Sequence, residues 1–314
     1  MTHFAANTTA ASQVISHSYL EATARERLQL LLDPDSLQEW LPPSARVTSP
    51  HLDQLDAPVA FDDGVVIGSA RLGNRPVFVA AQEGGFMGGA VGEVHGAKLV
   101  GMLRRAIRDR PQAVLLLLET GGVRLHEANA GLIAVSEVMR AVLNVRAARI
   151  PVIVLIGGAN GCFGGMGIVA RCANMIVMSE EGRLAMSGPE VIETANGVEE
   201  FDSRDRALVW RTTGGKHRYL LGDCQAIVAE SVEAFRTAAL DAIDVCKTQS
   251  VELTLATLEA EHTLLARRIE RFGESGDPLI IWRDLGMADV ENVPMLEADA
   301  FQAAAAEHRL GGPA

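Results

Sequence analysis

The residues with the clearest chemistry are glycines that follow an apolar segment. Residues 150–156 read Ile-Pro-Val-Ile-Val-Leu-Ile, and six of the eleven residues at 157–167 are glycine. An apolar run rich in β-branched residues is typical of a strand buried on both faces, and dense glycine after it indicates close approach of backbone to backbone or to a ligand. The amide N–H groups lie at the expected start of the next helix, where they can stabilise a developing negative charge.

Two earlier segments repeat this order of strand, glycine turn and helix. The strand expected over 76–80 leads into the turn 83–89, and the strand over 113–118 leads into 119–124. Apolar residues at helical spacing follow each turn. Because right-handed crossovers bring such turns to one edge of a parallel sheet, the sequence predicts a single site built from three backbone-exposing loops.

The rest of the chain is predicted to surround this core. Residues 1–17 are small, polar and aperiodic, which indicates a loose tail. The pattern further predicts a helix over 19–32, an irregular region over 40–50, a loop around 212–216, a last short strand over 225–228, helices over 231–247 and 250–272, and a helix from 297.

Composition argues against several classes of protein. The 314-residue chain has a formal net charge of −12, which is unsuited to general nucleic-acid binding. No apolar run approaches the ~18 residues of a membrane span, and residues 1–7 lack the features of a signal peptide. The four cysteines form no C-x-x-C pair, so no zinc site is expected. We therefore expect a cytoplasmic protein with reduced thiols.

Polar side chains beside the turns are candidates for binding or catalysis. Arg124 directly follows two glycines and is placed to bind an anion, or else to form a salt bridge with Glu119 or Glu127. His95 and His126 also lie near turns, where either reaches the site or serves a structural hydrogen bond.

Cys162 stands in a segment, Asn-Gly-Cys-Phe-Gly over 160–164, that resembles a nucleophile elbow with cysteine in place of serine. The first glycine of that motif is missing and no histidine is identifiable as its base. A small buried residue is therefore the favoured interpretation of Cys162.

Four sequence elements resemble the biotin-dependent carboxyltransferase family. Residues 119–127, ETGGVRLHE, resemble that family's DSGGARIQE element, and residues 86–95, FMGGAVGEVH, resemble FGGSLGEVH. ARERL at 24–28 with a following Leu-Asp-Pro resembles ARERI…LLDPGSF, and SGPEVI at 187–192 resembles SGPRVI. The elements occur in order between about residues 20 and 245.

This resemblance implies a crotonase-like α/β fold, of the ClpP/crotonase type, with stacked strand–glycine turn–helix units and C-terminal helices. Enzymes with this fold stabilise thioester enolates. On this basis we expect a carboxyltransferase-type domain over 18–290, preceded by the loose tail 1–17 and followed by a C-terminal helix or tail over 291–314.

Within the family, the segments TGGVRLHEA and GGKHR look most like the β subunits of malonate decarboxylases. That resemblance implies loss of CO2 from a malonyl thioester on an acyl carrier protein, through an enolate stabilised by backbone N–H groups. The donors expected by position are Gly121, Gly122, Val123, Gly164 and Gly165. The substrate-binding residues expected by position are Gly88, Gly89, Asn160, Arg124 and His126.

The resemblance also implies partners. The chain matches one half of a carboxyltransferase, so a γ subunit of the same fold is expected to complete the site. The substrate is expected on the phosphopantetheine-type (CoA-derived) arm of an acyl carrier protein subunit, with an acyl-carrier-protein transferase subunit in the same complex. No metal or cofactor is expected on this chain. Water, His126 or a partner residue is left open as the proton donor to the enolate.

Two alternatives also remain open. In one, the chain is a carboxyltransferase subunit that moves CO2 between an acyl thioester and a biotin carrier. No Met-Lys-Met biotinylation site is present, so the biotin would lie on another chain. In the other, the chain is a non-catalytic scaffold half whose glycines serve only tight packing.

Overall fold

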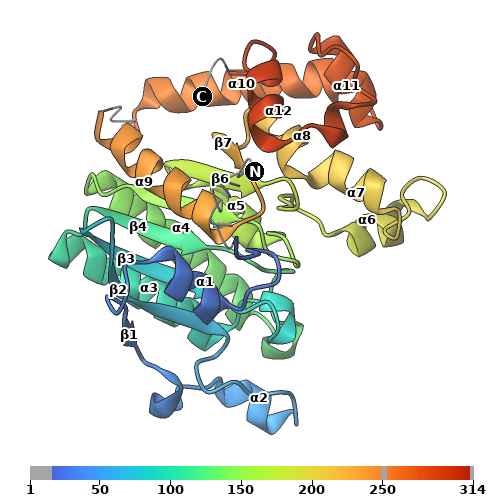
Figure 1. The fold of residues 1–314 in the computed structure, drawn as a ribbon. Coiled ribbons are helices and arrows are strands. Elements are labelled where there is room, and N and C mark those ends of the chain that lie inside the picture. Colours follow the sequence, from blue (N-terminus) through green and yellow to red (C-terminus); the bar gives the residue numbers. More distant parts are fainter. Residues whose placement is uncertain (1–15, 249–252, 312–314) are drawn as a thin grey trace, which may run out of the picture.

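The computed structural model describes residues 16–248 and 253–311, so most of the expected tail at 1–17 lies outside the described residues. Within these ranges one seven-stranded sheet has its strands in chain order (Figure 1). The strands are β1 Gln38–Trp40, β2 Val65–Leu72, β3 Arg75–Gln82, β4 Ala113–Leu117, β5 Val152–Ile156, β6 Met175–Ser179 and β7 Ala226–Val228. Strands β1 to β3 pair antiparallel, and β3 to β7 pair parallel.

Local sequence explains the main strands. β2 and β3 form a hairpin around Gly73 and Asn74, whose φ angles of 56° and 62° suit the tight turn that favours Asn and Gly. Every residue of β4 and β5 is buried, as expected for parallel strands covered on both faces. The predicted α/β architecture and the predicted order of its parallel strands are therefore confirmed.

Different helices cover the two faces of the sheet (Figure 1). The crossover helices α3 Glu93–Asp109, α4 Ala130–Ala147 and α5 Gly165–Arg171 pack on one face. Helices α1 Ala24–Leu31 and α9 Val232–Thr248 pack on the other. Because the crossovers all use the same face, their connecting turns gather at the same edge of the sheet.

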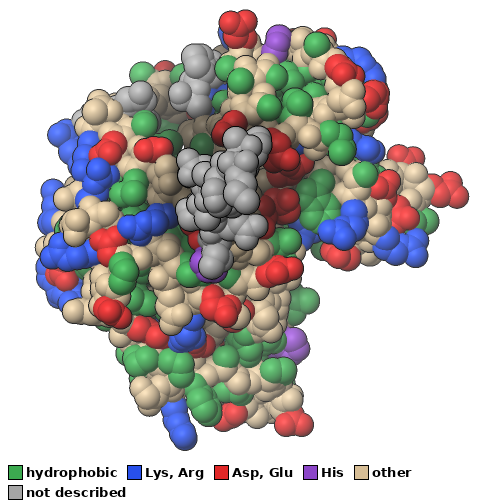
Figure 2. All heavy atoms as spheres, in the orientation of Figure 1, with side chains coloured by type: hydrophobic (Ala, Val, Ile, Leu, Met, Phe, Trp, Pro, Cys, Tyr) green, Lys and Arg blue, Asp and Glu red, His purple; other side chains and the backbone are tan. Residues whose placement is uncertain are grey.

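The C-terminal region forms a helical group beyond β6 and β7 (Figure 1). Its helices are α6 Pro189–Asn196, α7 Arg206–Thr213, α8 Gly215–Leu220, α10 Leu255–Phe272, α11 Pro278–Asp284 and α12 Ala298–Ala305. None of the helices within the described ranges is long and apolar enough to cross a membrane. On the face shown in Figure 2, acidic and basic side chains are interspersed.

One local prediction is wrong. The loop expected around 212–216 is the junction of α7 and α8, which meet at Gly214 in an extended conformation. The paired glycines do interrupt the helix, but burial of Lys216, His217 and Tyr219 draws the chain back into helical structure. The irregular region expected over 40–50 is confirmed: apart from one 3-10 turn, Pro43–Ala45, the chain is irregular between the end of β1 and the start of a short helix, α2 Pro50–Gln54.

Candidate active site

The turns after β3, β4 and β5 meet at the carboxyl edge of the sheet, which confirms their predicted placement. Backbone hydrogen bonds join them directly. The Gly121 N–H donates to the Gly88 oxygen (2.8 Å), and the Thr120 N–H donates to the Gly161 oxygen (2.8 Å). The Phe163 N–H then donates back to the Thr120 oxygen (2.9 Å). The turns therefore form a small second layer of extended backbone beyond the ends of the strands.

A fourth segment, after β6, completes this layer. The Cys162 N–H donates to the Arg183 oxygen (2.7 Å), and the Gly164 N–H donates to the Met186 oxygen (2.9 Å). These hydrogen bonds occupy many of the backbone amides in the glycine turns. Only an amide without such a bond can donate to a ligand.

Only two of the five expected donor amides are without a hydrogen-bond partner among the described residues. Gly121 and Gly164 are bonded as above, and the Gly122 N–H donates to Thr120 Oγ1 (3.1 Å). The amides of Val123 and Gly165 make no hydrogen bond within the described ranges. Both residues are half-buried, and their N–H groups are therefore the candidates for contact with a ligand.

These two open amides lie next to a point where the turns touch. A Cβ on Gly164 would lie 3.2 Å from the Gly122 Cα, so the two backbones are in contact. The Arg124 N–H donates to the Val91 oxygen (3.0 Å), and neighbouring N–H groups of extended backbone point to opposite sides. The Val123 N–H therefore points away from Val91, to the side on which Thr120 pairs with Cys162.

Gly164 adopts a backbone conformation that only glycine accepts readily. Its φ of 64° and ψ of −143° lie outside the regions open to residues with a Cβ atom. Gly164 immediately precedes α5, so its conformation sets the direction of the Gly165 amide.

Arg124 is a structural residue of its turn. Its guanidinium group is fully buried and donates to Asp63 Oδ2 (2.8 Å), the Asp63 carbonyl oxygen (2.8 Å), Glu127 Oε1 (3.0 Å) and the Ala90 carbonyl oxygen (3.0 Å). The salt bridge to Glu127 is one of the two weighed from sequence. These partners engage the guanidinium group from inside the protein, so we do not propose Arg124 as an anion ligand.

His95 takes part in the same buried network. The Gln82 amide oxygen accepts the Glu119 N–H (3.0 Å), so its NH2 group faces His95 Nε2 (3.1 Å). The imidazole proton then lies on Nδ1, which donates to the Asp63 carbonyl oxygen (3.2 Å). Burial, reinforced by the positive charge of Arg124, lowers the pKa of His95 to about 3. His95 is therefore a neutral structural histidine.

The other expected binding residues divide into two groups. His126 is exposed, three residues beyond Val123, and stays a candidate for contact with substrate. Asn160 uses its side chain inside the protein, where Nδ2 donates to the Gly84 oxygen (3.1 Å) and to Glu119 Oε1 (3.1 Å). Gly88 supplies a carbonyl acceptor to Gly121, and Gly89 is packed against the backbone of Glu119.

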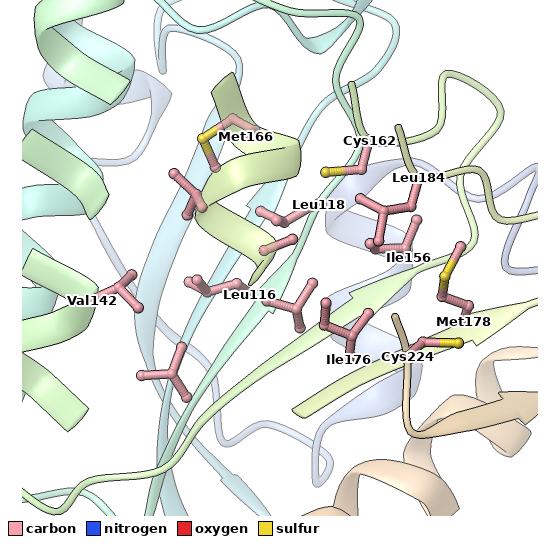
Figure 3. Close-up of a cluster of buried hydrophobic side chains, with 14 of the residues drawn as sticks. Leu116, Leu118, Val142, Ile156, Cys162, Met166, Ile176, Met178, Leu184 and Cys224 are labelled. Atoms are coloured by element: carbon pink, nitrogen blue, oxygen red, sulfur yellow. The ribbon is translucent and has the colours of Figure 1, made fainter. Parts of the chain in front are cut away.

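Cys162 lies inside the hydrophobic core. Its side chain lies in the cluster that contains Leu118, Ile156, Met166 and Leu184 (Figure 3). The residue has no exposed surface, and burial raises the pKa of its thiol. The favoured sequence interpretation, a small buried residue, is confirmed.

Sequence reasoning gave no role in the site to several residues that shape it. Thr120 fixes the Gly122 amide with its hydroxyl, Asp63 holds Arg124, and Arg27 reaches Glu119 from α1. Arg27 and Glu119 are separated by 92 positions, so spacing alone gave no sign of this contact. In the part of the chain that the structure describes, no group of three or more His, Cys, Asp or Glu residues is arranged to hold a metal ion.

Residues 16–229 match the carboxyl transferase domain family, and this chain belongs to that family. Its fold is the crotonase-like fold that the sequence predicted, shared with the solved structures of that family.

Among curated relatives, the chain is 48% identical over 233 residues to the malonyl-S-ACP:biotin-protein carboxyltransferase MADC of Malonomonas rubra, a match that covers 70% of this chain and 73% of the relative. It is 32% identical over 182 residues to the methylmalonyl-CoA carboxyltransferase 12S subunit of Propionibacterium freudenreichii subsp. shermanii, covering 58% of this chain but only 33% of that protein.

A similar solved structure is that of a Pseudomonas malonate decarboxylase hetero-tetramer in complex with malonate. The TM-score is 0.70 and the sequence identity 42%, and the match covers 73% of this chain and 84% of the matched chain. Relatives of this chain therefore include both a biotin-protein carboxyltransferase and a subunit of a malonate decarboxylase. These relatives support a catalytic subunit.

Proposed function

We propose that this chain is the β subunit of a malonate decarboxylase and that, with a γ subunit, it converts malonyl-S-acyl-carrier-protein into acetyl-S-acyl-carrier-protein and CO2. The observation that carries the proposal is the pair of open amides, Val123 and Gly165, in turns that are locked to one another. Fixed N–H donors aimed at a developing oxyanion lower the barrier because they need no reorganisation during the reaction.

The chemistry follows from where the charge develops. As the bond between the malonyl carboxylate and the α-carbon breaks, its electron pair moves into a carbon–carbon double bond, and the thioester oxygen becomes an enolate oxygen. CO2 leaves, and the α-carbon then takes up a proton from water, His126 or a partner residue. In this proposal the amides of Val123 and Gly165 bind the enolate oxygen. Loss of one such donor costs about 100- to 1,000-fold in rate.

Exposed apolar residues beside the turns support a partner at this edge. Leu125 is 84% exposed, Leu132 and Ile133 in the first turn of α4 are 57% and 61% exposed, and Met186 is 62% exposed. Apolar residues this exposed around a candidate site are typical of a protein interface. We assign this surface to the γ subunit, and the hetero-tetrameric state of the similar Pseudomonas enzyme supports a multi-subunit assembly.

The acyl group is proposed to arrive on a carrier protein's phosphopantetheine-type arm, as implied by the substrate named for the relative MADC. An open backbone site at an interface suits a long flexible arm, because the arm can enter between the two subunits. We also include an acyl-carrier-protein transferase subunit in this proposal, because the chain is similar to a subunit of a malonate decarboxylase complex.

A second candidate function is transfer of the carboxyl group to biotin on a carrier protein. The name of the 48% identical relative, a malonyl-S-ACP:biotin-protein carboxyltransferase, favours it specifically. The same pair of amides would serve, because transfer also passes through an enolate. The two functions differ in the acceptor of CO2, which lies outside this chain.

The deciding experiment measures release of labelled CO2 from a malonyl carrier protein labelled in its free carboxyl group. Three mixtures are compared: this chain alone, this chain with its γ partner, and both chains with a biotinylated carrier. Release that needs both chains but no biotin supports the decarboxylase. Label that leaves the malonyl group only when the biotin carrier is added, and that is recovered on the biotin, moves the conclusion to carboxyl transfer. Absence of both labelled CO2 and labelled biotin in all three mixtures contradicts both functions.

A further inference from the structure

A buried carboxylate joins the three glycine turns at their base. We propose that Glu119 is a positioning residue that sets the distance and direction between the two open amides, Val123 and Gly165. The inference rests on the proposed function of those amides and adds the part of the protein that holds them in place.

One oxygen of Glu119 binds the turn after β5. Glu119 directly precedes the glycine turn after β4 and is only 4% exposed. Its Oε1 accepts hydrogen bonds from the Asn160 backbone N–H (3.2 Å) and from Asn160 Nδ2 (3.1 Å). The same Nδ2 donates to the Gly84 oxygen (3.1 Å) in the turn after β3. A single carboxylate and one amide side chain thus connect all three turns.

The second oxygen fixes this group to the body of the protein. Oε2 accepts a hydrogen bond from Arg27 of α1, whose Nε donates to the Tyr19 oxygen (2.7 Å). Arg27 itself is 2% exposed. In addition, the Glu119 backbone N–H donates to Gln82 Oε1 (3.0 Å) at the end of β3. Glu119 is therefore anchored to two separate elements, α1 and β3.

Two glycines are shaped around this carboxylate. A Cβ on Gly84 would lie 2.3 Å from Glu119 Oε1, and a Cβ on Gly158 would lie 2.4 Å from the same carboxylate group. Those distances are far below van der Waals contact, so no other residue fits at either position without moving Glu119. Close approach to a side chain therefore explains these glycines, and no substrate contact is needed to account for them.

The connection from Glu119 to the open amides runs through backbone that is itself bonded. Beyond Glu119, Thr120 is paired with Gly161 and Phe163, and the chain then reaches Val123. Beyond Asn160, the chain passes through the same bonds to Gly164 and Gly165. A shift of Glu119 relative to Asn160 therefore moves one amide relative to the other, and a misplacement of ~1 Å at a reacting centre costs about 100-fold in rate.

Asn160→Ala is the first test, because it removes the link to Gly84 and to Glu119 without leaving a buried charge unpaired. The assay is CO2 release by the assembled complex, with kcat and the KM for the malonyl carrier measured separately. We expect kcat to fall about 10-fold while KM stays within about twofold, since the amides would be displaced and the carrier's docking surface would not. Glu119→Gln, which also loses the charge opposite Arg27, is expected to lower kcat about 100-fold.

The matched control is Asp223→Asn, which also alters a buried carboxylate paired with arginine, but at the C-terminal end of α5, away from the glycine turn at its start. It is expected to lower the unfolding temperature and to keep kcat within about twofold of wild type. If Asn160→Ala assembles normally and keeps the wild-type kcat, the positioning role is refuted. The positioning role is also refuted if Asp223→Asn lowers kcat as much as Asn160→Ala does for the same loss of stability. Absence of CO2 release from the wild-type complex would instead refute the proposed function itself.

Discussion

Two regions of this molecule bury a carboxylate against arginine and use it differently. At the carboxyl edge of the sheet, Glu119 is paired with Arg27 and is surrounded by glycine turns whose amides are partly open. In the C-terminal helical group, Asp223 is paired with Arg268 (2.8 Å) and Arg218 (3.2 Å), with Arg171 donating to its carbonyl oxygen (2.8 Å).

The difference lies in the backbone around each carboxylate. The Asp223 N–H donates to the Arg218 oxygen (2.7 Å), and its arginine partners belong to the helices α5, α8 and α10, where amides are used within the helix. Around Glu119 the backbone is extended, and two amides remain without a partner in the described residues. Of these two buried ion pairs, only Glu119–Arg27 lies beside backbone amides without a hydrogen-bond partner in the described residues. The open amides, and not the ion pair by itself, therefore distinguish the candidate site.

The largest effect that this comparison predicts is loss of turnover in Gly164→Ala. A Cβ atom at Gly164 would lie 3.2 Å from the Gly122 Cα, and the φ of 64° is strained for a residue with a Cβ, so we expect alanine to shift the Gly165 amide. Loss of an oxyanion donor predicts a fall in kcat of about 100- to 1,000-fold, measured as CO2 release by the complex. If the variant assembles poorly but each assembled complex turns over normally, the glycines serve packing alone and the scaffold alternative is favoured.

Next in size is the effect of Asp223→Asn on stability. Removal of one partner from a buried ion pair typically costs about 3–5 kcal/mol, and here it leaves arginines without their counter-charge. Chemical denaturation should show a loss of about this size, whereas kcat per folded complex should stay within about twofold. A large fall in kcat without a loss of stability would show that the C-terminal helical group takes part in catalysis.

Each region also buries a neutral histidine, which predicts a shared pH dependence. Burial lowers the pKa of His95 and of His217 to about 3, with Arg124 and Arg218 as the respective second causes. Above pH ~6.5 neither the folded nor the unfolded state is protonated at these residues, so they make no contribution. As the pH falls from ~6.5 towards 3, only the unfolded state takes up the proton, and each histidine lowers the free energy of unfolding by about 1.4 kcal/mol per pH unit.

His95→Gln and His217→Gln test this separately in the two regions. Each variant should reduce the slope of unfolding free energy against pH, between pH 6 and 4, by about 1.4 kcal/mol per unit. Urea titrations at several pH values would measure the slopes. A variant with the wild-type slope would show that its histidine is protonated in the folded protein.

The smallest predicted effect is a gain in stability from Gly101→Ala. Gly101 lies on the exposed side of α3, and a Cβ there would meet no atom within 4 Å. Alanine should raise the free energy of unfolding by about 0.5–1 kcal/mol and leave kcat unchanged. This variant is also the control for Gly164→Ala, because the same substitution is made where no open amide depends on it. A loss of activity in Gly101→Ala would weaken the argument from Gly164.

The sequence was sufficient to predict the scaffold of the site. Apolar runs at 113–118 and 150–156 and the glycines after them predicted parallel strands with their turns at one edge, because that pattern depends on local burial and on crossover handedness. The helices α7 and α8 were missed because Gly214 and Gly215 indicate a loop locally, whereas burial of Lys216 and His217 is a tertiary effect.

The fine structure of the site could not be predicted in the same way. Glycine density shows that amides are uncovered, but only the fold shows that those of Gly121 and Gly164 are already bonded and that those of Val123 and Gly165 are not. Arg27 joins Glu119 from a distant helix, so no local pattern reports this contact. Side chains whose partners lie far away in the chain are the part of a site that sequence spacing does not encode.

The most direct test of the central claim replaces the Val123 amide by an ester, through incorporation of the corresponding α-hydroxy acid. This change removes the N–H donor and keeps the side chain, the Arg124 bond to Val91 and the contact between the turns. If the amide stabilises the enolate oxygen, kcat for CO2 release should fall about 100-fold or more, with the KM for the malonyl carrier nearly unchanged. A wild-type kcat in the ester variant would contradict the account.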